Sequence, residues 1–370
     1  MGDMLLSRRT AAALLVVSAV ALAGCASPTP VPTPESAESE AATILTSVVA
    51  SGLDAPWSIA FHGETALVSE RDSARIVEIT ATGGAREVGR IEGVRAGGEG
   101  GLLGIAVHED QLYTYLTADA GDGGASENRI ERRDLLGDPG ALSLGDAATV
   151  IDGIPAAGNH NGGRIAFGPD GMLYATTGDA GDRESAQDPD ALSGKILRLT
   201  PEGAVPDDNP IAGSAVYTLG HRNPQGIAWA EDGTMYASEF GQDTWDELNV
   251  IIAGENYGWP TVEGIADREG FVDPVQQWSP STASPSGIAV AADEIVIANL
   301  RGERLRIVPL AGTGTAFELH GGEQRGEYGR LRDAVAAPDG SVWVLTNNTD
   351  GRGDPRDGDD RILRVDFGEG

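Results

Sequence analysis

The sequence predicts an all-β protein folded as a six-bladed β-propeller, and three observations lead to this prediction. The 370 residues include 52 glycines and 20 prolines, a turn-dense composition that disfavours long helices. An apolar strand, a polar turn and a second apolar strand recur six times, and a further strand-like run follows most copies. Repeats of this size, each with several short strands, are typical of propeller blades around a central channel.

The six copies follow one another along the chain at spacings that suit one propeller blade each. Their marker positions are separated by 46, 60, 62, 61 and 47 residues, and they are Ile59, Ile105, Ile165, Ile227, Ile288 and Val335. We expect a strand around residues 44–49 to join the last blade, which ends at Asp366, and so to close the ring. A β-sandwich pair or an open solenoid is the alternative, but the count of six favours a closed ring.

The N-terminal segment has the order of a secretory signal. Residues 1–25 contain Arg8 and Arg9, an apolar run too short for a comfortable membrane span, and the sequence LAGC ending at Cys25. LAGC resembles the lipobox of bacterial lipoproteins, so we expect a lipid-modified Cys25 and an extracytoplasmic, membrane-anchored protein; ordinary signal cleavage nearby is the alternative. Residues 26–43 are expected to form a disordered tether, and residues 44–368 the propeller domain.

The charge of the chain limits its partners. The formal net charge is -31, and Lys195 is the only lysine. The negative electrostatic field of such a chain argues against nucleic acid and anionic membrane surfaces as partners. We therefore expect membrane attachment only through lipidated Cys25.

The stretch from Gly158 to Asp182 brings two titratable residues to one end of a predicted hairpin. His160 lies before the strand Ile-Ala-Phe, a tight turn follows, and Asp179 comes after the second strand. Residues in these positions emerge at the same end of a hairpin. We therefore expect His160 and Asp179 to lie within reach of each other. A lone histidine is more often a structural hydrogen-bonding group, but the loop position of His160 favours a chemical role.

Two further clusters flank the repeated strands. A glycine-rich stretch containing Glu99 precedes the second unit, and its glycines permit close approach of the backbone to a flat ligand. Arg222 and Asn223 precede the fourth unit, where a planar guanidinium can face an anionic oxygen. After that unit, acidic side chains and backbone carbonyls around Gly241 and Gln242 offer the hard oxygen ligands that calcium prefers. The alternative is that the acidic residues only cap turns.

Three arginines gather near the last two units. Arg301 follows the fifth unit, while Arg330 and Arg332 alternate with an apolar residue ahead of the sixth. On a strand Arg330 and Arg332 face the same way, and two guanidinium groups aimed alike repel each other unless an anion joins them. The three arginines together indicate a ligand with several carboxylates or phosphates. Ion pairs with neighbouring Asp and Glu are the alternative.

Several long motifs together resemble one family. They are HNGGRIAFGPDG, TTGDAGD, GHRNPQGIAW, SEFGQDTWDELNVI, NYGWP and GRLRD. In this order, over about residues 53–365, the sequence resembles the soluble pyrroloquinoline quinone (PQQ)-dependent aldose and glucose dehydrogenases of the glucose/sorbosone dehydrogenase family. The resemblance implies a six-bladed propeller enzyme that oxidises the anomeric hydroxyl of an aldose to a lactone. Hydride would pass to PQQ, with calcium polarising the quinone, and the final electron acceptor is left unknown.

The resemblance also implies roles for residues at matching positions. His160 would be the general base, Asp179 would orient its imidazole, and Arg222 would stabilise charge on the quinone oxygens. The residues around the cofactor would be Glu99, Arg222, Asn223, Arg301, Arg330 and Arg332. Calcium ligands would be the backbone carbonyls of Gly241 and Gln242, and, in a second site, Glu247 and the Tyr257 carbonyl.

The sequence departs from the family pattern at two of these positions. Glu99 stands where glucose-oxidising members carry glutamine, and Arg301 where they carry lysine. A carboxylate at position 99 is unfavourable beside a tricarboxylate ligand unless it is paired or protonated. Two other functions stay open. One is a calcium-dependent propeller lactonase, which would leave the arginines unexplained, and the other is a non-catalytic surface propeller that binds a glycan or a partner protein.

Overall fold

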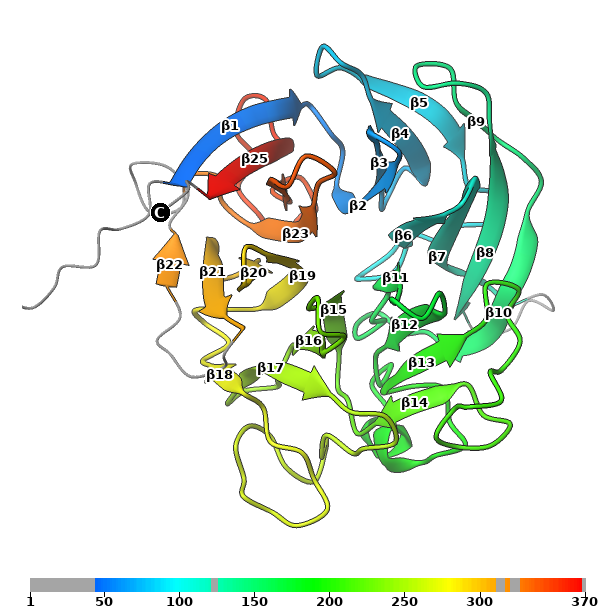
Figure 1. Cartoon of the computed structure of the whole chain (residues 1–370), viewed down its shortest axis with the longest axis vertical. Helices are drawn as coiled ribbons and strands as arrows, with labels where there is room; N and C mark the ends of the chain where they lie inside the picture. Colours follow the sequence, from blue (N-terminus) through cyan, green and yellow to red (C-terminus); the bar gives the residue numbers. More distant parts are fainter. Residues whose placement is uncertain (1–43, 121–125, 311–316, 320–326, 368–370) are drawn as a thin grey trace, which may run out of the picture. The chain divides into compact units, whose positions relative to one another are not determined.

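Six antiparallel sheets follow one another around a common centre (Figure 1). The structure is a computed structural model that describes residues 44–120, 126–310, 317–319 and 327–367. The innermost strand of each sheet contacts the innermost strand of the next, and those of the sixth and first sheets also meet. The predicted six-bladed β-propeller is therefore confirmed. The predicted signal peptide and tether, residues 1–43, lie outside the described residues.

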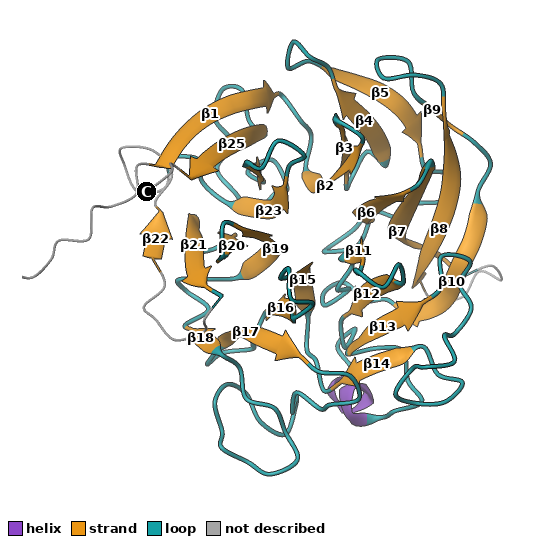
Figure 2. Cartoon of the chain, in the orientation of Figure 1, coloured by secondary structure: helices purple, strands orange, loops and turns teal. Residues whose placement is uncertain are grey.

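The first three sheets are built from consecutive strands (Figure 2). The first contains β2 (Pro56–His62), β3 (Thr65–Glu70), β4 (Arg75–Ile79) and β5 (Ala85–Arg90). The second contains β6 (Leu102–His108), β7 (Gln111–Asp119), β8 (Ser126–Leu136) and β10 (Ala148–Pro155), and β9 (Ser143–Leu144) also pairs with β8. The third contains β11 (Ile165–Phe167), β12 (Leu173–Thr177), β13 (Lys195–Leu199) and β14 (Val216–Leu219).

The remaining sheets repeat this order, except that the last takes its outer strand from the N-terminal end of the described chain. The fourth contains β15 (Pro224–Trp229), β16 (Met235–Glu239), β17 (Asp246–Ile251) and β18 (Gln276–Trp278). The fifth contains β19 (Pro285–Ala291), β20 (Glu294–Asn299), β21 (Arg304–Pro309) and β22 (Phe317–Leu319). The sixth contains β23 (Leu331–Ala336), β24 (Val342–Thr346), β25 (Arg361–Phe367) and β1 (Ile44–Ser51).

One short 3-10 helix, η1 (Arg183–Gln187), lies between β12 and β13 and is the only helical element in the described part of the chain. Within those residues, a helix with the length and apolar character needed to cross a bilayer does not occur.

The two ends of the described chain close the ring. β1 pairs antiparallel with β25, from Ile44 opposite Phe367 to Ser51 opposite Arg361. This is the strand pairing that the sequence predicts for the last blade. Because β1 supplies the outer strand of the sixth sheet, that sheet is completed only when both ends of the domain are present.

The hydrophobic core is divided into six parts, one between each pair of neighbouring sheets. Leu67 and Ile76 of the first sheet pack with Leu102 and Leu112 of the second. The same arrangement recurs around the ring. Sheets buried on both faces are built from nearly continuous apolar strands, which explains why β24 reads Val-Trp-Val-Leu-Thr rather than alternating between apolar and polar residues.

A buried polar cluster joins four sheets at the centre. Arg164, just before β11, donates from Nη1 to Asp333 Oδ2 of β23 at 2.8 Å and to Ser58 Oγ of β2 at 2.9 Å. Its Nε donates to the Gln225 carbonyl of β15 at 2.9 Å, and its guanidinium lies 4.4 Å from the centre of the Trp57 ring. Burial lowers the pKa of Arg164 and raises the pKa of Asp333, and the opposite charge of each partner limits both shifts. The cluster thus ties together sheets that are not neighbours.

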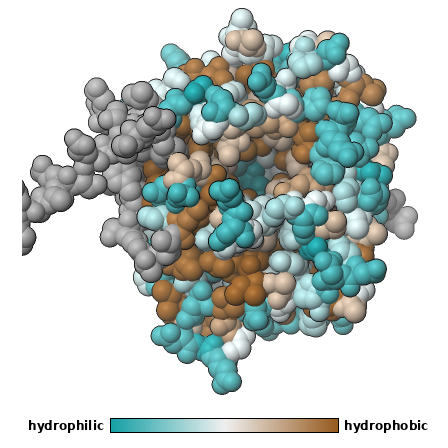
Figure 3. Space-filling model, in the orientation of Figure 1, coloured by the Kyte–Doolittle hydropathy of each residue, from teal (hydrophilic) through white to brown (hydrophobic). Residues whose placement is uncertain are grey.

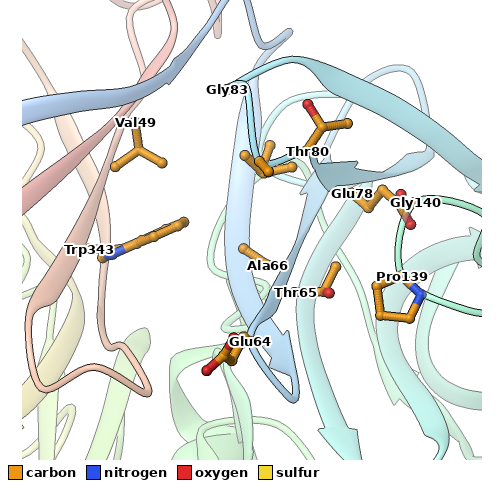
Figure 4. A pocket seen from close by; sticks show the side chains of 12 residues that line it. Val49, Glu64, Thr65, Ala66, Glu78, Thr80, Gly83, Pro139, Gly140 and Trp343 are labelled. Atoms are coloured by element: carbon orange, nitrogen blue, oxygen red, sulfur yellow. The ribbon is translucent and has the colours of Figure 1, made fainter.

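A hollow of about 480 Å³ lies away from this centre, between the sixth and first sheets (Figure 4). Trp343 of β24 and Val49 of β1 lie on one side of it, and Ala66 of β3 lies opposite. It is larger than the cavities near the ring centre, but none of the predicted catalytic, cofactor or metal residues lines it. Volume alone therefore does not locate the site.

Asp333→Asn tests the contribution of the central cluster. The substitution keeps the size of the side chain but leaves the Arg164 guanidinium buried without its counter-charge, so we expect the free energy of unfolding to fall by about 3–5 kcal/mol. Asp152→Asn removes the same charge at an exposed position of β10 and should change that free energy by less than about 0.5 kcal/mol. Urea denaturation measures both values, and equal stability of the two variants would contradict the role given to the cluster.

Candidate active site

His160 and Asp179 form a hydrogen-bonded pair, as the hairpin pattern predicts. β11 pairs with β12 in antiparallel register, and His160 Nδ1 lies 2.7 Å from Asp179 Oδ1. The side chain of Asp179 is fully buried, whereas 14% of the His160 side chain is exposed. The imidazole therefore stands between a buried carboxylate and solvent.

The backbone holds His160 in an uncommon conformation. Its φ is +59°, a left-handed value that costs a non-glycine residue about 1–3 kcal/mol. Glu99 Oε2 accepts a hydrogen bond from His160 N at 2.8 Å, and the His160 carbonyl accepts one from Ala180 N at 3.1 Å. A Cβ on residue 178 would come within 2.0 Å of that carbonyl, so Gly178 is required for this close approach. These contacts fix the position from which the imidazole projects.

Three donors surround the carboxylate of Asp179. Oδ1 accepts from Gly181 N at 2.8 Å in addition to His160, and Oδ2 accepts from Trp259 Nε1 at 2.9 Å. Burial would raise the pKa of Asp179, but the hydrogen bonds from His160, the Gly181 backbone and Trp259 hold it below its ordinary value. An ionised Asp179 keeps a proton on His160 Nδ1, which leaves Nε2 as the nitrogen able to accept one.

The helix η1 supports the loop around Asp179. The Arg183 guanidinium lies 4.6 Å from the centre of the Trp259 ring, and Gln187 Nε2 donates to the Trp259 carbonyl at 2.6 Å. Lys195 is fully buried, and its Nζ donates to three backbone carbonyls in and around η1 at 2.7, 3.2 and 2.7 Å. Burial lowers the pKa of Lys195 to about 8. The sequence analysis assigned no role to Lys195.

Arg222 and Asn223 each present a buried donor that has no hydrogen-bond partner among the described residues. These donors are Arg222 Nε and Asn223 Nδ2. Two other atoms of these side chains are bonded: Arg222 Nη1 donates to the Gly241 carbonyl at 2.7 Å, and Asn223 Oδ1 accepts from Gly162 N at 3.0 Å. A buried donor without a partner costs about 1–3 kcal/mol. The pair therefore suits a ligand that brings acceptor oxygens.

A cavity at the centre of the ring is lined by positive charges. Its walls come from five of the six sheets and their loops, and the charged residues among them are Arg71, Glu99, Arg332 and Arg352. The face in Figure 3 is hollowed near its centre, with hydrophilic residues inside the hollow. The cavity volume is about 20 Å³, little more than one water needs.

Asp350 is the anion that joins the predicted arginine pair. Its Oδ2 lies 3.2 Å from Arg330 Nη2 and 3.9 Å from Arg332 Nη2. Arg71 Nη2 donates to the Asp350 carbonyl at 3.2 Å. Burial would raise the pKa of Asp350, but the nearby Arg330 and Arg332 hold it below its ordinary value. Arg330 and Arg332 around this one carboxylate leave a positive surplus that fits an anionic ligand.

Glu99 and Arg301 are placed differently. Glu99 Oε1 lies 3.1 Å from Arg352 Nη1, so the charge that would disfavour an anionic ligand is paired. Arg301 is exposed in the turn after β20 and makes no hydrogen bond or ion pair with another described residue. The structure therefore brings together the predicted cofactor residues at positions 99, 222, 223, 330 and 332 but leaves Arg301 apart from them.

Glu247 faces Glu239 across two neighbouring strands. The two residues are direct partners in the β16–β17 register, and both are buried. Burial, followed by the charge of Glu239, raises the pKa of Glu247 to about 8. With Glu263 and Tyr257 they line a cavity of about 10 Å³. Within the described ranges, no three His, Cys, Asp or Glu side chains are grouped so as to hold a metal ion, so a cation here would also need backbone or water ligands.

Gly241 and Gln242 lie in the turn between β16 and β17. The Gly241 carbonyl accepts from Arg222, and Gln242 N donates to Glu263 Oε1 at 2.7 Å. A Cβ on residue 241 would lie 1.7 Å from the Trp245 carbonyl, so the turn requires glycine. Because a carbonyl oxygen has two lone pairs, a cation bound at Gly241 would share that oxygen with the guanidinium.

Arg71, Asp350 and Arg352 are the charged residues of this region that sequence reasoning missed. Each follows the second strand of its sheet within a few residues, as Asp179 and Gly241 do. In a closed ring of repeats, loops at the same point of each repeat reach the same end of the channel. That equivalence is the signal that could have identified them.

Comparisons with known proteins agree with the motifs. The sequence profile described as Glucose / Sorbosone dehydrogenase matches residues 53–363. Aldose sugar dehydrogenase YliI of Escherichia coli K12 is 30% identical over 349 residues, which are 84% of this chain and 92% of the relative. Quinoprotein glucose dehydrogenase B of Acinetobacter calcoaceticus is 30% identical over 257 residues, 60% of this chain and 54% of the relative, so this match spans about half of that protein.

A solved structure of the PQQ-bound form of aldose sugar dehydrogenase from Streptomyces coelicolor has the same fold. The TM-score is 0.81 at 48% identity, with 88% of this chain and 98% of that chain covered. The resemblance read from the motifs and the prediction of a sugar dehydrogenase are both confirmed at the level of the family. The chain belongs to the glucose/sorbosone dehydrogenase family.

Proposed function

We propose that the protein oxidises the anomeric hydroxyl of an aldose to the lactone, with PQQ as the hydride acceptor and calcium as the activating ion. The observation that carries this proposal is the position of the His160–Asp179 pair beside a cationic cavity. Glu99 links the two, because it contacts the His160 backbone and also lines the cavity. Membership of the family and the likeness to a PQQ-bound relative support it.

The donors around the cavity suit PQQ, a flat ligand with three carboxylates. Arg71, Arg330 and Arg332 would hold the carboxylates, since guanidinium groups match carboxylate geometry. The donors on Arg222 and Asn223 that lack a partner would bind further ligand oxygens. Arg301 follows the cavity residue Leu300 and would have to turn toward the ligand to take part. When bound, PQQ supplies an electrophilic carbon that accepts the hydride.

His160 Nε2 is the atom that would take the proton from the sugar hydroxyl. Asp179 holds the opposite ring nitrogen, so the imidazolium formed by proton transfer gains a charged partner at 2.7 Å. Trp259 and the Gly181 backbone keep that carboxylate in place. Arg222 would stabilise the negative charge that develops on the nearby ligand oxygens, because a fixed cation in a buried site does not need to reorganise.

Calcium would occupy two places. One lies at the carbonyls of Gly241 and Gln242, and the other at Glu247 with the Tyr257 carbonyl. The second place is supported by its chemistry, since Glu239 and Glu247 are buried carboxylates that face each other and a hard cation with oxygen ligands would relieve their repulsion. A propeller lactonase would leave the arginine cluster unexplained.

Reconstitution tests the proposed reaction. Purified protein supplied with PQQ and calcium should reduce a redox dye in the presence of aldoses, and His160→Ala should lower kcat by about 10²–10⁴-fold because the base is lost. His108→Ala, at the last residue of β6 and outside the cavities lined by the site residues, is the matched control and should retain the rate. Dye reduction that is absent from the folded wild-type protein, or equal in His160→Ala, would refute the proposal.

Calcium binding has its own readout in thermal stability. Calcium at about 100 times its Kd should stabilise the fold by about 2.7 kcal/mol, and a chelator should reverse the effect. Glu247→Gln should reduce this stabilisation, because it removes the buried carboxylate ligand of one of the two places. Glu269→Gln, at an exposed position, should respond to calcium like the wild type. Melting curves measured with and without calcium give the stabilisation of each variant. If calcium raised the melting temperature of Glu247→Gln as much as that of the wild type, Glu247 would not be a ligand.

A further inference from the structure

Glu99 and Arg352 form an ion pair between loops of different sheets. Glu99 lies in the loop before β6, and Arg352 lies in the loop between β24 and β25. Glu99 Oε1 is 3.1 Å from Arg352 Nη1, and both residues line the central cavity together with Arg71 and Arg332. The pair is therefore part of the surface that an anionic ligand in this cavity would meet.

Stability does not account for this pair. The Arg352 side chain is 46% exposed and the Glu99 side chain 18% exposed. An ion pair with one partner this open to solvent contributes little to folding, because water screens the charges and two long side chains lose freedom. The reason for opposite charges at these two positions must therefore lie in what the central cavity binds.

Glu99 has a second partner that explains why a carboxylate is useful at this position. Its Oε2 accepts from His160 N at 2.8 Å, and His160 has the left-handed φ of +59°. Glu99 thus helps to hold the backbone of the base with one oxygen, while the other faces Arg352. Without a partner, however, a carboxylate in this cavity would repel a ligand that carries carboxylates.

Arg352 is the arginine available to cancel that charge. Arg71 is also near Glu99, but its Nε donates to Asp72 at 2.7 Å, and Arg332 lies 3.9 Å from Asp350. The Arg352 guanidinium, by contrast, bonds directly to Glu99. Arg71 and Arg332 are thus each already close to another carboxylate, Asp72 and Asp350 respectively.

We propose that Arg352 is a cofactor-site residue that neutralises Glu99, so that the cavity can bind the carboxylates of PQQ while Glu99 continues to hold the backbone of His160. This inference rests on the proposed function, since PQQ is the anionic ligand concerned. It predicts that the two residues are coupled: the cost of losing Arg352 depends on whether position 99 carries a charge.

A double-mutant cycle on PQQ affinity measures that coupling. The Kd of PQQ for the full chain with calcium is followed by quenching of tryptophan fluorescence. Arg352→Ala should weaken binding by about tenfold or more at low salt, because Glu99 is left without its partner. Glu99→Gln should bind at least as tightly as the wild type, since glutamine can still accept from His160 N. Glu99→Gln combined with Arg352→Ala should return the Kd to within about threefold of the wild type.

Arg356→Ala is the matched control. Arg356 is an exposed arginine in the same loop that does not line the cavity, so its loss changes the net charge equally and should leave the Kd within about threefold of the wild type. Melting temperatures of all variants should match that of the wild type, which separates a binding effect from misfolding.

Two results would overturn the inference. In the first, the Kd of PQQ for Arg352→Ala equals the Kd for Arg356→Ala. In the second, the double variant binds PQQ as weakly as Arg352→Ala alone. The second result would mean that Arg352 acts only by direct contact with the ligand. A folded wild-type protein that does not bind PQQ would instead overturn the proposed function itself, so the two failures are distinguishable.

Discussion

Every sheet of this propeller buries both faces against neighbouring sheets, and the pairing of β1 with β25 completes the sixth sheet and so allows the arrangement to close. The site depends on this closure. Because equivalent loops of each repeat converge at one end of the channel, residues from distant parts of the chain become neighbours there. His160 precedes the first strand of the third sheet, Asp179 follows its second strand, and Arg352 follows the second strand of the sixth. Loss of closure would therefore separate catalytic and cofactor residues together.

The charge distribution is the second feature that shapes the site. A chain with a net charge of -31 concentrates guanidinium groups around the centre of its ring. Some of them are structural: Arg164 is bonded to Asp333 and holds four sheets together. Others surround a single carboxylate, Asp350, and leave a positive surplus. An anionic ligand would then be drawn to the centre of the ring, while the rest of the surface repels other anions.

Much of the fold could be predicted from the sequence, because a propeller is encoded by local patterns that repeat. The six strand pairs, the closing strand and the His160–Asp179 hairpin each follow from a short stretch of chain. The contacts that could not be predicted join residues far apart in sequence. No local pattern shows that Arg352 pairs with Glu99, 253 positions away, or that Trp259 donates to Asp179, 80 positions away. The burial of a lone charge such as Lys195 could not be predicted from the sequence either, since its partners are backbone carbonyls.

In the proposed reaction, His160, held by Asp179, removes the proton from the C1 hydroxyl of the sugar while the hydrogen on C1 leaves as a hydride. Rapid mixing of the PQQ-loaded protein with glucose carrying hydrogen or deuterium at C1 tests this most directly. We expect the cofactor absorbance to change in a single turnover, and to change more slowly with deuterium because the bond between C1 and that atom breaks. Equal rates with the two sugars in a step limited by chemistry, or sugar turnover without any change in the cofactor, would contradict it.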